Sequence, residues 1–288
     1  MAGAMRGARR VRKGAASSNR GVARTGWRDS RMRHRKSILI TGAASGIGLA
    51  TARLFARNGW FVACVDWNAA ALAALSDELG SDAALFATVD ISNRADVLAV
   101  VAQVGEITGG SLDILHNNAG IDAKGSFANM GWEQIEQVVS VNLLGGLSLI
   151  HAAYPLLKGT PGSLCFSTAS GSAIFGVANM AVYSATKHAI KGLTEALAVE
   201  FAPDGVRAAD VLPGIIDTGM LDPAQKAKLP VTGMWRPIPA DAIAETVWAA
   251  YRGTKLHYYV PEELAELNVT VTTQPEAMRD NRIANPPV

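Results

Sequence analysis

Short apolar runs alternate with longer amphipathic runs along this chain, from residue 37 to about residue 260. Apolar runs without polar alternation are typical of strands that are buried on both faces and covered by helices. Strict alternation of strands and helices predicts an α/β fold, a doubly wound parallel β-sheet flanked by helices on both faces, in a single domain. The expected strands are residues 37–41, 60–66, 83–89, 112–117, 162–170, 206–212 and 256–260, and the expected helices are residues 46–58, 69–79, 94–108, 132–157, 181–201 and 240–252.

The basic residues are concentrated at the N-terminus, so the formal charge of +2 is misleading. Residues 1–36 hold 12 of the 27 basic residues and one acid, which leaves 15 basic and 24 acidic residues, a net charge of −9, in the rest. Nucleic-acid binding needs a basic face on the folded domain, so this acidic body argues against a nucleic-acid partner. We expect residues 37–260 to form the domain and residues 261–288, where the pattern fades, to form a C-terminal tail.

Residues 1–36 combine low hydrophobicity with high charge, which is the composition of a disordered extension. The segment lacks the apolar centre of a secretory signal. Two alternatives stay open. One is a mitochondrial transit peptide, although periodic apolar residues are missing, and the other is an arm that binds nucleic acid or an acidic membrane.

The remaining composition predicts a cytoplasmic protein that does not enter the membrane. We find no apolar run that approaches the roughly 20 residues needed to cross a bilayer. Cys64 and Cys165 fall inside apolar, strand-like runs, so we expect buried thiols in a reducing compartment. The five histidines are scattered without ligand spacing, so we expect no metal site.

A glycine-rich turn separates the first expected strand from the first expected helix, at Thr41-Gly42-Ala43-Ala44-Ser45-Gly46-Ile47-Gly48. In this context Gly42 allows a tight turn, Gly46 lets the backbone approach a pyrophosphate, and Gly48 permits close packing of helix against strand. Backbone amides at the start of the helix then face the phosphates. The segment therefore predicts a dinucleotide site.

The second expected strand ends in an acid, Asp66, 18 residues after Gly48. A carboxylate here would accept hydrogen bonds from both ribose hydroxyls of NAD and would repel the 2′-phosphate of NADP. The positions that could hold a phosphate-binding cation carry Ala43, Ala44 and Trp67. The sequence therefore favours NAD over NADP, unless Asp66 is only a strand-end acid.

Two further strand ends carry polar or glycine residues. Asp90, followed by Ile91, comes after the third strand and could hold the adenine amino group, or could cap the next helix. The fourth strand ends in Asn117-Asn118-Ala119-Gly120, which is ordinary turn chemistry but lies at the edge where a ligand binds in this fold.

Tyr183 and Lys187 lie four residues apart in an expected helix, so they share one face. An unperturbed tyrosine has a pKa of about 10, which is too high for a base near neutrality, and a nearby ammonium lowers it. The pair therefore predicts a phenol that transfers a proton. The alternative is an amphipathic tyrosine beside a solvated lysine.

The motifs TGxxxGxG, NNAG and YxxxK, with a Pro-Gly pair after a later strand, resemble the short-chain dehydrogenase/reductase family in its short single-domain branch. The resemblance covers residues 37–260 and implies a Rossmann fold, NAD and a small-molecule alcohol or carbonyl substrate. It implies an enzyme that interconverts a secondary alcohol and a ketone by hydride transfer. The alternative is a catalytically silent NAD-binding scaffold or sensor, whose sign would be loss of Tyr183 or Lys187. The resemblance also implies a homotetramer or homodimer, with contacts through residues 132–157 and 181–201.

In the family, an Asn-Ser-Tyr-Lys tetrad performs the reaction, and it maps onto Asn142, Ser170, Tyr183 and Lys187. The resemblance implies that Asn142 anchors a water linked to Lys187; alternatively, Asn142 bends its helix or lies on the surface. The implied cofactor contacts are Thr41, Gly42, Ser45, Gly46, Ile47, Gly48, Asp66, Trp67, Asp90, Ile91, Asn118, Ala119, Gly120, Tyr183, Lys187, Pro213, Gly214, Ile216 and Thr218.

The serine of the tetrad lies in a cluster of hydroxyl residues. Ser170 stands 13 residues before Tyr183, the separation usual in the family, but Ala173 replaces the glycine that often follows. Ser167 and Thr168 therefore stay open as alternatives.

The segment after the Pro-Gly pair, residues 219–239, resembles the family's mobile lid over the substrate. Its apolar residues would line the substrate pocket, or pack as an ordinary surface loop; they are Met220, Leu221, Met234 and Trp235.

Overall fold

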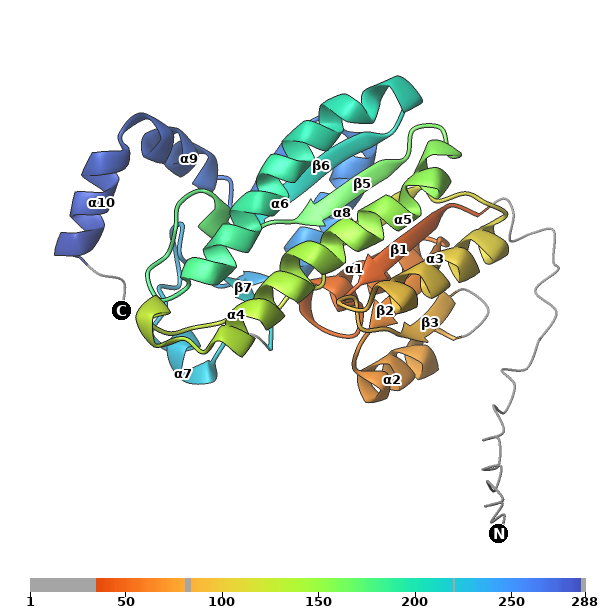
Figure 1. The fold of residues 1–288 in the computed structure, drawn as a ribbon, viewed down its shortest axis with the longest axis horizontal. Coiled ribbons are helices and arrows are strands. Elements are labelled where there is room, and N and C mark those ends of the chain that lie inside the picture. Colours follow the sequence, from red (N-terminus) through yellow and green to blue (C-terminus); the bar gives the residue numbers. More distant parts are fainter. Residues whose placement is uncertain (1–34, 81–83, 220, 286–288) are drawn as a thin grey trace, which may run out of the picture.

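The computed structural model describes residues 35–80, 84–219 and 221–285. Its centre is a seven-stranded parallel sheet in the order β3-β2-β1-β4-β5-β6-β9 (Figure 1). The strands are β1 (Ser37–Thr41), β2 (Phe61–Asp66), β3 (Ala84–Thr88), β4 (Ile114–Asn117), β5 (Leu164–Thr168), β6 (Arg207–Pro213) and β9 (His257–Val260). Every neighbouring pair is parallel, for example Leu39 beside Ala63 and Leu115. The predicted fold, a doubly wound parallel sheet in a single domain, is confirmed.

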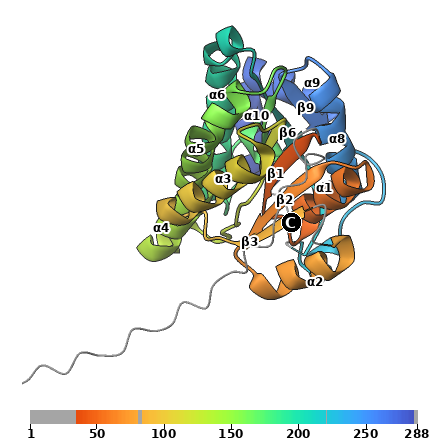
Figure 2. The same cartoon turned by 90° about the vertical axis from the view of Figure 1, so that its right-hand side faces the viewer.

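Helices cover both faces of the sheet (Figure 2). One face carries α1 (Gly46–Arg57) and α8 (Ala240–Arg252), with α2 (Ala69–Leu79) beside them, and the other carries α3 (Arg94–Thr108), α5 (Gly146–Lys158) and α6 (Ala181–Glu200). Each face has its own apolar core, so strand residues alternate between the two: Leu39 packs toward α3 and α5, and Ile38 toward α1 and α8. Cys64 and Cys165 are buried free thiols, as predicted.

The helix expected over residues 132–157 is interrupted. It consists of α4 (Trp132–Val139), a π-helical segment over Ser140–Gly145 and then α5. A Cβ on Gly145 would stand 2.9 Å from the carbonyl oxygen of Ile91, and one on Gly146 would stand 2.8 Å from Nδ2 of Asn117. Both glycines therefore let the helix approach the carboxyl edge of the sheet closely, at the point where its winding changes.

This helical stretch, Trp132–Lys158, has the length and mean hydropathy of a membrane-spanning helix, contrary to the expectation that no segment would. Its apolar residues Leu149, Ala153 and Leu157 lie in the core against α3 and the sheet. Core helices of globular domains share this composition, and packing inside the domain explains it here.

Three apolar side chains are exposed on the two helices that were predicted to carry subunit contacts. They are Trp132, Leu144 and, on α6, Val199.

Several short elements escaped prediction. The segment after β6 forms β7 (Ile216–Asp217), which pairs with β8 (Ile238–Pro239), and between them lies α7 (Pro223–Lys226). Two helices follow β9 where we expected a tail, α9 (Leu264–Thr273) and α10 (Pro275–Ala284). Single 3-10 turns occur at Phe127–Asn129, Gly171–Ala173 and Ala202–Asp204. The basic extension, residues 81–83, Met220 and the last three residues lie outside the described part of the chain.

Candidate active site

The carboxyl ends of parallel strands meet at one edge of a sheet, and the predicted site residues follow those ends. β1 leads into the glycine-rich turn, β4 into Asn118, β5 into Ser170 and β6 into Gly214. These strands are neighbours in the order β1-β4-β5-β6. The sheet therefore brings the predicted nucleotide residues and the predicted tetrad to one rim.

The three glycines of the turn have the conformations that their predicted roles require. Gly42 and Gly46 have φ of 67° and 49°, in the left-handed region that favours glycine. A Cβ on Gly48 would stand 2.0 Å from the carbonyl oxygen of Gly42, so only glycine lets α1 lie this close to the turn. A Cβ on Gly46 would stand 3.0 Å from Cγ2 of Thr218, which places Thr218 against the turn.

The start of α1 suits an anion. Ser45 precedes the helix, is exposed and makes no side-chain capping hydrogen bond, and the first turn holds no acidic residue. Ile47, in that turn, is half-buried. The N-terminal amides and the helix dipole favour a negative group at this position.

Asp66 is held by the turn itself. Its carboxylate accepts hydrogen bonds from the amides of Ala44 and Asn68, both at 3.0 Å, and the residue is only 7% exposed. These bonds fix the carboxylate at the rim, beside the turn. Trp67, which follows it, is 76% exposed. The carboxylate is therefore built into the nucleotide edge of the sheet rather than solvated at a free strand end.

Asp90 does not cap α3, so that alternative is wrong. The N-cap of α3 is Asn93, whose side chain accepts a hydrogen bond from the amide of Ala95. Asp90 instead accepts hydrogen bonds from the amide and hydroxyl of Ser92, at 2.9 and 2.7 Å. Ile91 is buried beside it.

The side chain of Asn118 ties three strands together. Its Nδ2 donates to the carbonyl oxygen of Thr41 at 2.9 Å, and its Oδ1 accepts from the hydroxyl of Thr168 at 3.0 Å. The hydroxyl of Thr41 accepts hydrogen bonds from the amides of Asn118 and Ala119, both at 3.1 Å. The side chains of Thr41 and Asn118 therefore stabilise the carboxyl edge of the sheet. The sequence did not predict these hydrogen bonds, because partners on different strands leave no local pattern.

Asn142 lies in the π-helical segment and is buried. Its side chain bonds both backbone groups of Ile121, accepting from the amide and donating to the carbonyl, each at 2.8 Å. It also donates to the hydroxyl of Thr186 at 3.3 Å. A Cβ on Gly120 would stand 3.3 Å from Oδ1 of Asn142 and 3.5 Å from Nζ of Lys187, so these three residues converge.

The side chain of Ser170 lies close enough to the phenol of Tyr183 to favour its ionised form. Ser170 precedes the 3-10 turn Gly171–Ala173, and its Oγ accepts the amide of Ser172 at 3.1 Å. The other two hydroxyl candidates lie in β5: Ser167 is buried, and Thr168 is bonded to Asn118. Of these three hydroxyl residues, only Ser170 lowers the pKa of the Tyr183 phenol within the described part of the chain.

Lys187 is buried on the same face of α6, four residues after Tyr183. Its Nζ donates to the carbonyl oxygen of Thr168 at 2.8 Å and lies 5.6 Å from the centroid of the Tyr183 ring. Burial lowers the pKa of Lys187 to about 8. The predicted pair is therefore assembled, with the ammonium beside the ring.

The pKa of Tyr183 moves in the direction opposite to our expectation. Burial raises it, Asp122 raises it further, and the side chain of Ser170 opposes the rise. Removal from water disfavours the phenolate more strongly than the neighbouring groups favour it. The group that opposes the rise in the pKa of the phenol is Ser170 rather than Lys187.

The segment after β6 returns to the site. The amide of Gly214 donates to the carbonyl oxygen of Val260 at 2.7 Å, and a Cβ on Gly171 would stand 3.3 Å from the carbonyl oxygen of Pro213. Ile216 is held in the small β7–β8 sheet. Farther along, Trp235 contacts Phe175 edge-on, with ring centroids 6.4 Å apart. The predicted lid residues Met234 and Trp235 thus pack near the segment that follows Ser170.

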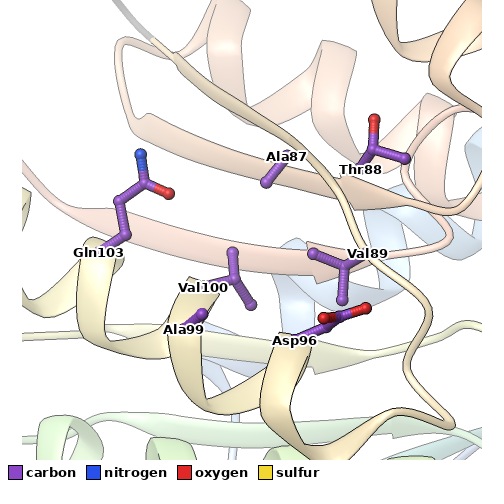
Figure 3. Close-up of a pocket in the computed structure, with 7 residues that line it drawn as sticks. All are labelled: Ala87, Thr88, Val89, Asp96, Ala99, Val100 and Gln103. Atoms are coloured by element: carbon purple, nitrogen blue, oxygen red, sulfur yellow. The ribbon is translucent and has the colours of Figure 1, made fainter. Parts of the chain in front are cut away.

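Figure 3 shows a cavity of about 190 Å³ between β3 and α3. Ala87, Thr88 and Val89 line it from the strand side, and Asp96 and Gln103 from the helix. None of the four tetrad residues lines this cavity, so it is not the reaction site. Within residues 35–80, 84–219 and 221–285, no cluster of His, Cys, Asp and Glu could hold a metal ion.

The short chain dehydrogenase family model matches residues 36–229. Oxidoreductase UcpA of Salmonella typhimurium is 33% identical, over 73% of this chain and 82% of that protein. Meso-2,3-butanediol dehydrogenase of Serratia marcescens is 33% identical, over 64% of this chain and 73% of that protein. A crystal structure of 3-ketoacyl-(acyl-carrier-protein) reductase from Brucella melitensis, complexed with NADH, superposes with a TM-score of 0.71 at 32% identity, over 78% of this chain and 96% of that one.

Proposed function

Because the chain belongs to the short-chain dehydrogenase/reductase family, we propose that it is an NAD-dependent oxidoreductase that interconverts a secondary alcohol and a ketone. The observation that carries the proposal is the buried Lys187, whose Nζ lies 5.6 Å from the centroid of the Tyr183 ring, with Ser170 beside the phenol. The names of the relatives, among them a diol dehydrogenase and a ketoacyl reductase, agree with this reaction class. Screening secondary alcohols and ketones for formation or loss of NADH tests it.

The glycine-rich turn fits a dinucleotide. Gly46 and Gly48 leave room that a Cβ would fill, and the acid-free first turn of α1 offers amides to a pyrophosphate. When bound, the nicotinamide accepts or supplies the hydride at its C4. The family resemblance implies that Ile216 would bind the nicotinamide carboxamide and that Thr218, which lies against the turn, would contact a phosphate.

Two side chains, Ser170 and Tyr183, would position the substrate and transfer the proton. Ser170 donates a hydrogen bond to the substrate oxygen and positions it, and the Tyr183 phenolate takes the alcohol proton during oxidation. In the reverse direction the phenol returns that proton. Positioned proton transfer of this kind contributes about 10²- to 10⁴-fold to the rate.

Lys187 and Asn142 would complete the tetrad. Lys187, beside the Tyr183 ring, would bind the ribose next to the nicotinamide, as the family resemblance implies. Asn142 holds Ile121 and lies with Lys187 around Gly120, so it would fix the backbone beside Lys187.

The buried carboxylate of Asp66 supports NAD as the cofactor, because it would face the adenosine ribose and repel a 2′-phosphate. We expect the double variant Asp66→Ser, Trp67→Arg to raise the ratio of kcat/KM with NADP to kcat/KM with NAD at least about tenfold, equivalent to about 1.4 kcal/mol. Steady-state kinetics with both cofactors measure the ratio. Asp77→Ser, on the exposed side of α2, is the control. An unchanged ratio in the double variant would place cofactor discrimination elsewhere.

The pH dependence of oxidation should report the phenol. Because burial raises the pKa of Tyr183, oxidation, which needs the phenolate, should rise with pH through the alkaline range. Removing Ser170 removes the group that opposes this rise, so Ser170→Ala should shift the profile to higher pH and lower kcat. Ser172→Ala, in the same turn, should leave the profile in place. A profile that Ser170→Ala does not move would show that another group titrates.

A further inference from the structure

The last helix, α10, touches the rest of the protein through one face. Among its residues only Met278 and Arg282 are half-buried, and they stand four residues apart. The other residues of α10 are exposed, including Ile283 at 73%. With α9, the helix lies beyond the carboxyl edge of the sheet (Figure 1), on the side of the candidate active site.

Arg282 stacks on the segment that follows Ser170. Its guanidinium carbon lies 3.6 Å from the centroid of the Phe175 ring. Its Nε is buried without a hydrogen-bond partner in the described part of the chain, and no acidic residue described there forms an ion pair with it. Burial also lowers the pKa of Arg282.

Three parts of the protein meet at Phe175. The residue lies five positions after Ser170, contacts Trp235 of the predicted lid, and carries Arg282 of α10 on its ring. A second contact ties the lid to the C-terminal helices, because Arg236 pairs with Glu263 at 2.9 Å, just before α9. The C-terminal helices therefore contact both the predicted lid and the segment that follows Ser170.

The half-buried guanidinium of Arg282, whose Nε has no hydrogen-bond acceptor, raises the free energy of the folded state. Leaving a charged donor unsatisfied forfeits more free energy than a cation–π contact, worth about 0.5–2 kcal/mol, returns. The two terminal guanidinium nitrogens of Arg282 are not among the buried unpaired atoms, and through them the planar group can bind a carboxylate or phosphate by two parallel hydrogen bonds.

We propose that Arg282 binds an anionic group, a carboxylate or phosphate, on the substrate. The inference rests on the proposed function, because it assigns Arg282 to one end of a substrate whose carbinol group would lie at Ser170 and Tyr183. Five residues span at most about 18 Å between the Cα atoms of Ser170 and Phe175. The substrate class is therefore a hydroxy or keto compound whose anionic group lies within this distance of the reacting carbon.

The test compares medium-chain hydroxy acids and hydroxyalkyl phosphates with the methyl esters of the same acids. We expect wild-type kcat/KM to be higher for one anionic series than for the esters. Arg282→Gln should lower kcat/KM for that series about 10- to 100-fold, mainly through KM, and leave the esters nearly unchanged. Arg282→Lys should lose less than Arg282→Gln. Arg279→Gln, on the same helix but exposed and paired with Asp280, is the matched control and should behave as wild type.

The assignment would be overturned if Arg282→Gln lost activity equally with acids and esters, or if wild type preferred neither anion. Arg282 would then only pack against Phe175.

A second experiment needs no turnover. It measures binding of a straight-chain fatty acid and of its methyl ester in the presence of NADH, by tryptophan fluorescence. If wild type binds the acid more tightly than the ester and Arg282→Gln does not, the assignment is supported. If no alcohol is oxidised in that case, only the proposed function is contradicted. Turnover of the esters without a preference for either anion would support the proposed function and contradict the assignment of Arg282.

Discussion

Tyr183→Phe is expected to lower kcat at least about 100-fold while leaving the Kd for NADH within about twofold of wild type, because positioned proton transfer supplies about 10²- to 10⁴-fold. The substitution removes one oxygen and keeps the ring beside Lys187. Steady-state kinetics and fluorescence titration with NADH measure the two quantities separately. A loss confined to kcat would identify the phenol as a group that acts on the reacting molecule rather than on the cofactor.

The control is Tyr251→Phe. This change removes a hydroxyl outside the tetrad, which accepts a hydrogen bond from Lys36 and donates one to Asp113. It should cost some stability and leave kcat unchanged. Substantial turnover in Tyr183→Phe would refute the role of this phenol as proton carrier. Equal losses in the two variants would point to a general effect of losing a buried hydroxyl.

Gly48→Ala is the second change with a large expected effect. The added Cβ would stand 2.0 Å from the carbonyl oxygen and 2.7 Å from the carbonyl carbon of Gly42, so backbone must move. Overpacking typically costs about 1–3 kcal/mol, and a contact this short with backbone lies at or above the upper end of that range. We expect a lower melting temperature and NADH binding weakened more than about tenfold.

The matched control for this change is Gly192→Ala. Gly192 lies inside α6, where a Cβ would meet nothing within 4 Å, and alanine is the better helix former by up to about 1 kcal/mol. It should be neutral or slightly stabilising and bind NADH as wild type does. Normal NADH binding by Gly48→Ala would contradict the account of the turn as a nucleotide cradle.

The elements with strong local signals were predicted with their observed bounds. The strand over residues 37–41 and the helices over 69–79 and 94–108 agree with β1, α2 and α3. Buried apolar runs mark the strand, and both helices begin after an asparagine cap, Asn68 or Asn93, and end at a glycine, Gly80 or Gly109. These signals lie within a few residues of the boundary that they fix.

The C-terminal helices lack such signals in part. α9 is rich in valine and threonine, which favour strands, and Glu263 before it provides no side-chain cap. α10 does carry a signal that could have been used: Pro275 and Glu276 at its start and Arg282 in its last turn. The π-helical segment gives no comparable pattern beyond the Gly145-Gly146 pair that follows Asn142.

At the candidate site, the proximity of Tyr183 and Lys187 was predictable from spacing, but the direction of the pKa shift of Tyr183 was not. Spacing brought Tyr183 and Lys187 to one helix face, whereas the pKa of Tyr183 depends on how deeply the fold buries the phenol. The same limit applies to Asn118, whose side chain braces β1 and β5. Burial and cross-strand hydrogen bonds belong to the tertiary structure, so no short motif encodes them.

The most direct measurement is transfer of deuterium from NADH labelled at C4 to a panel of ketones, followed by mass spectrometry of the alcohols. The account predicts one deuterium on the carbinol carbon in wild type, and almost none in Tyr183→Phe with the cofactor still bound. Tight NADH binding by wild type without deuterium transfer to any ketone would contradict it and would favour a silent NAD-binding protein.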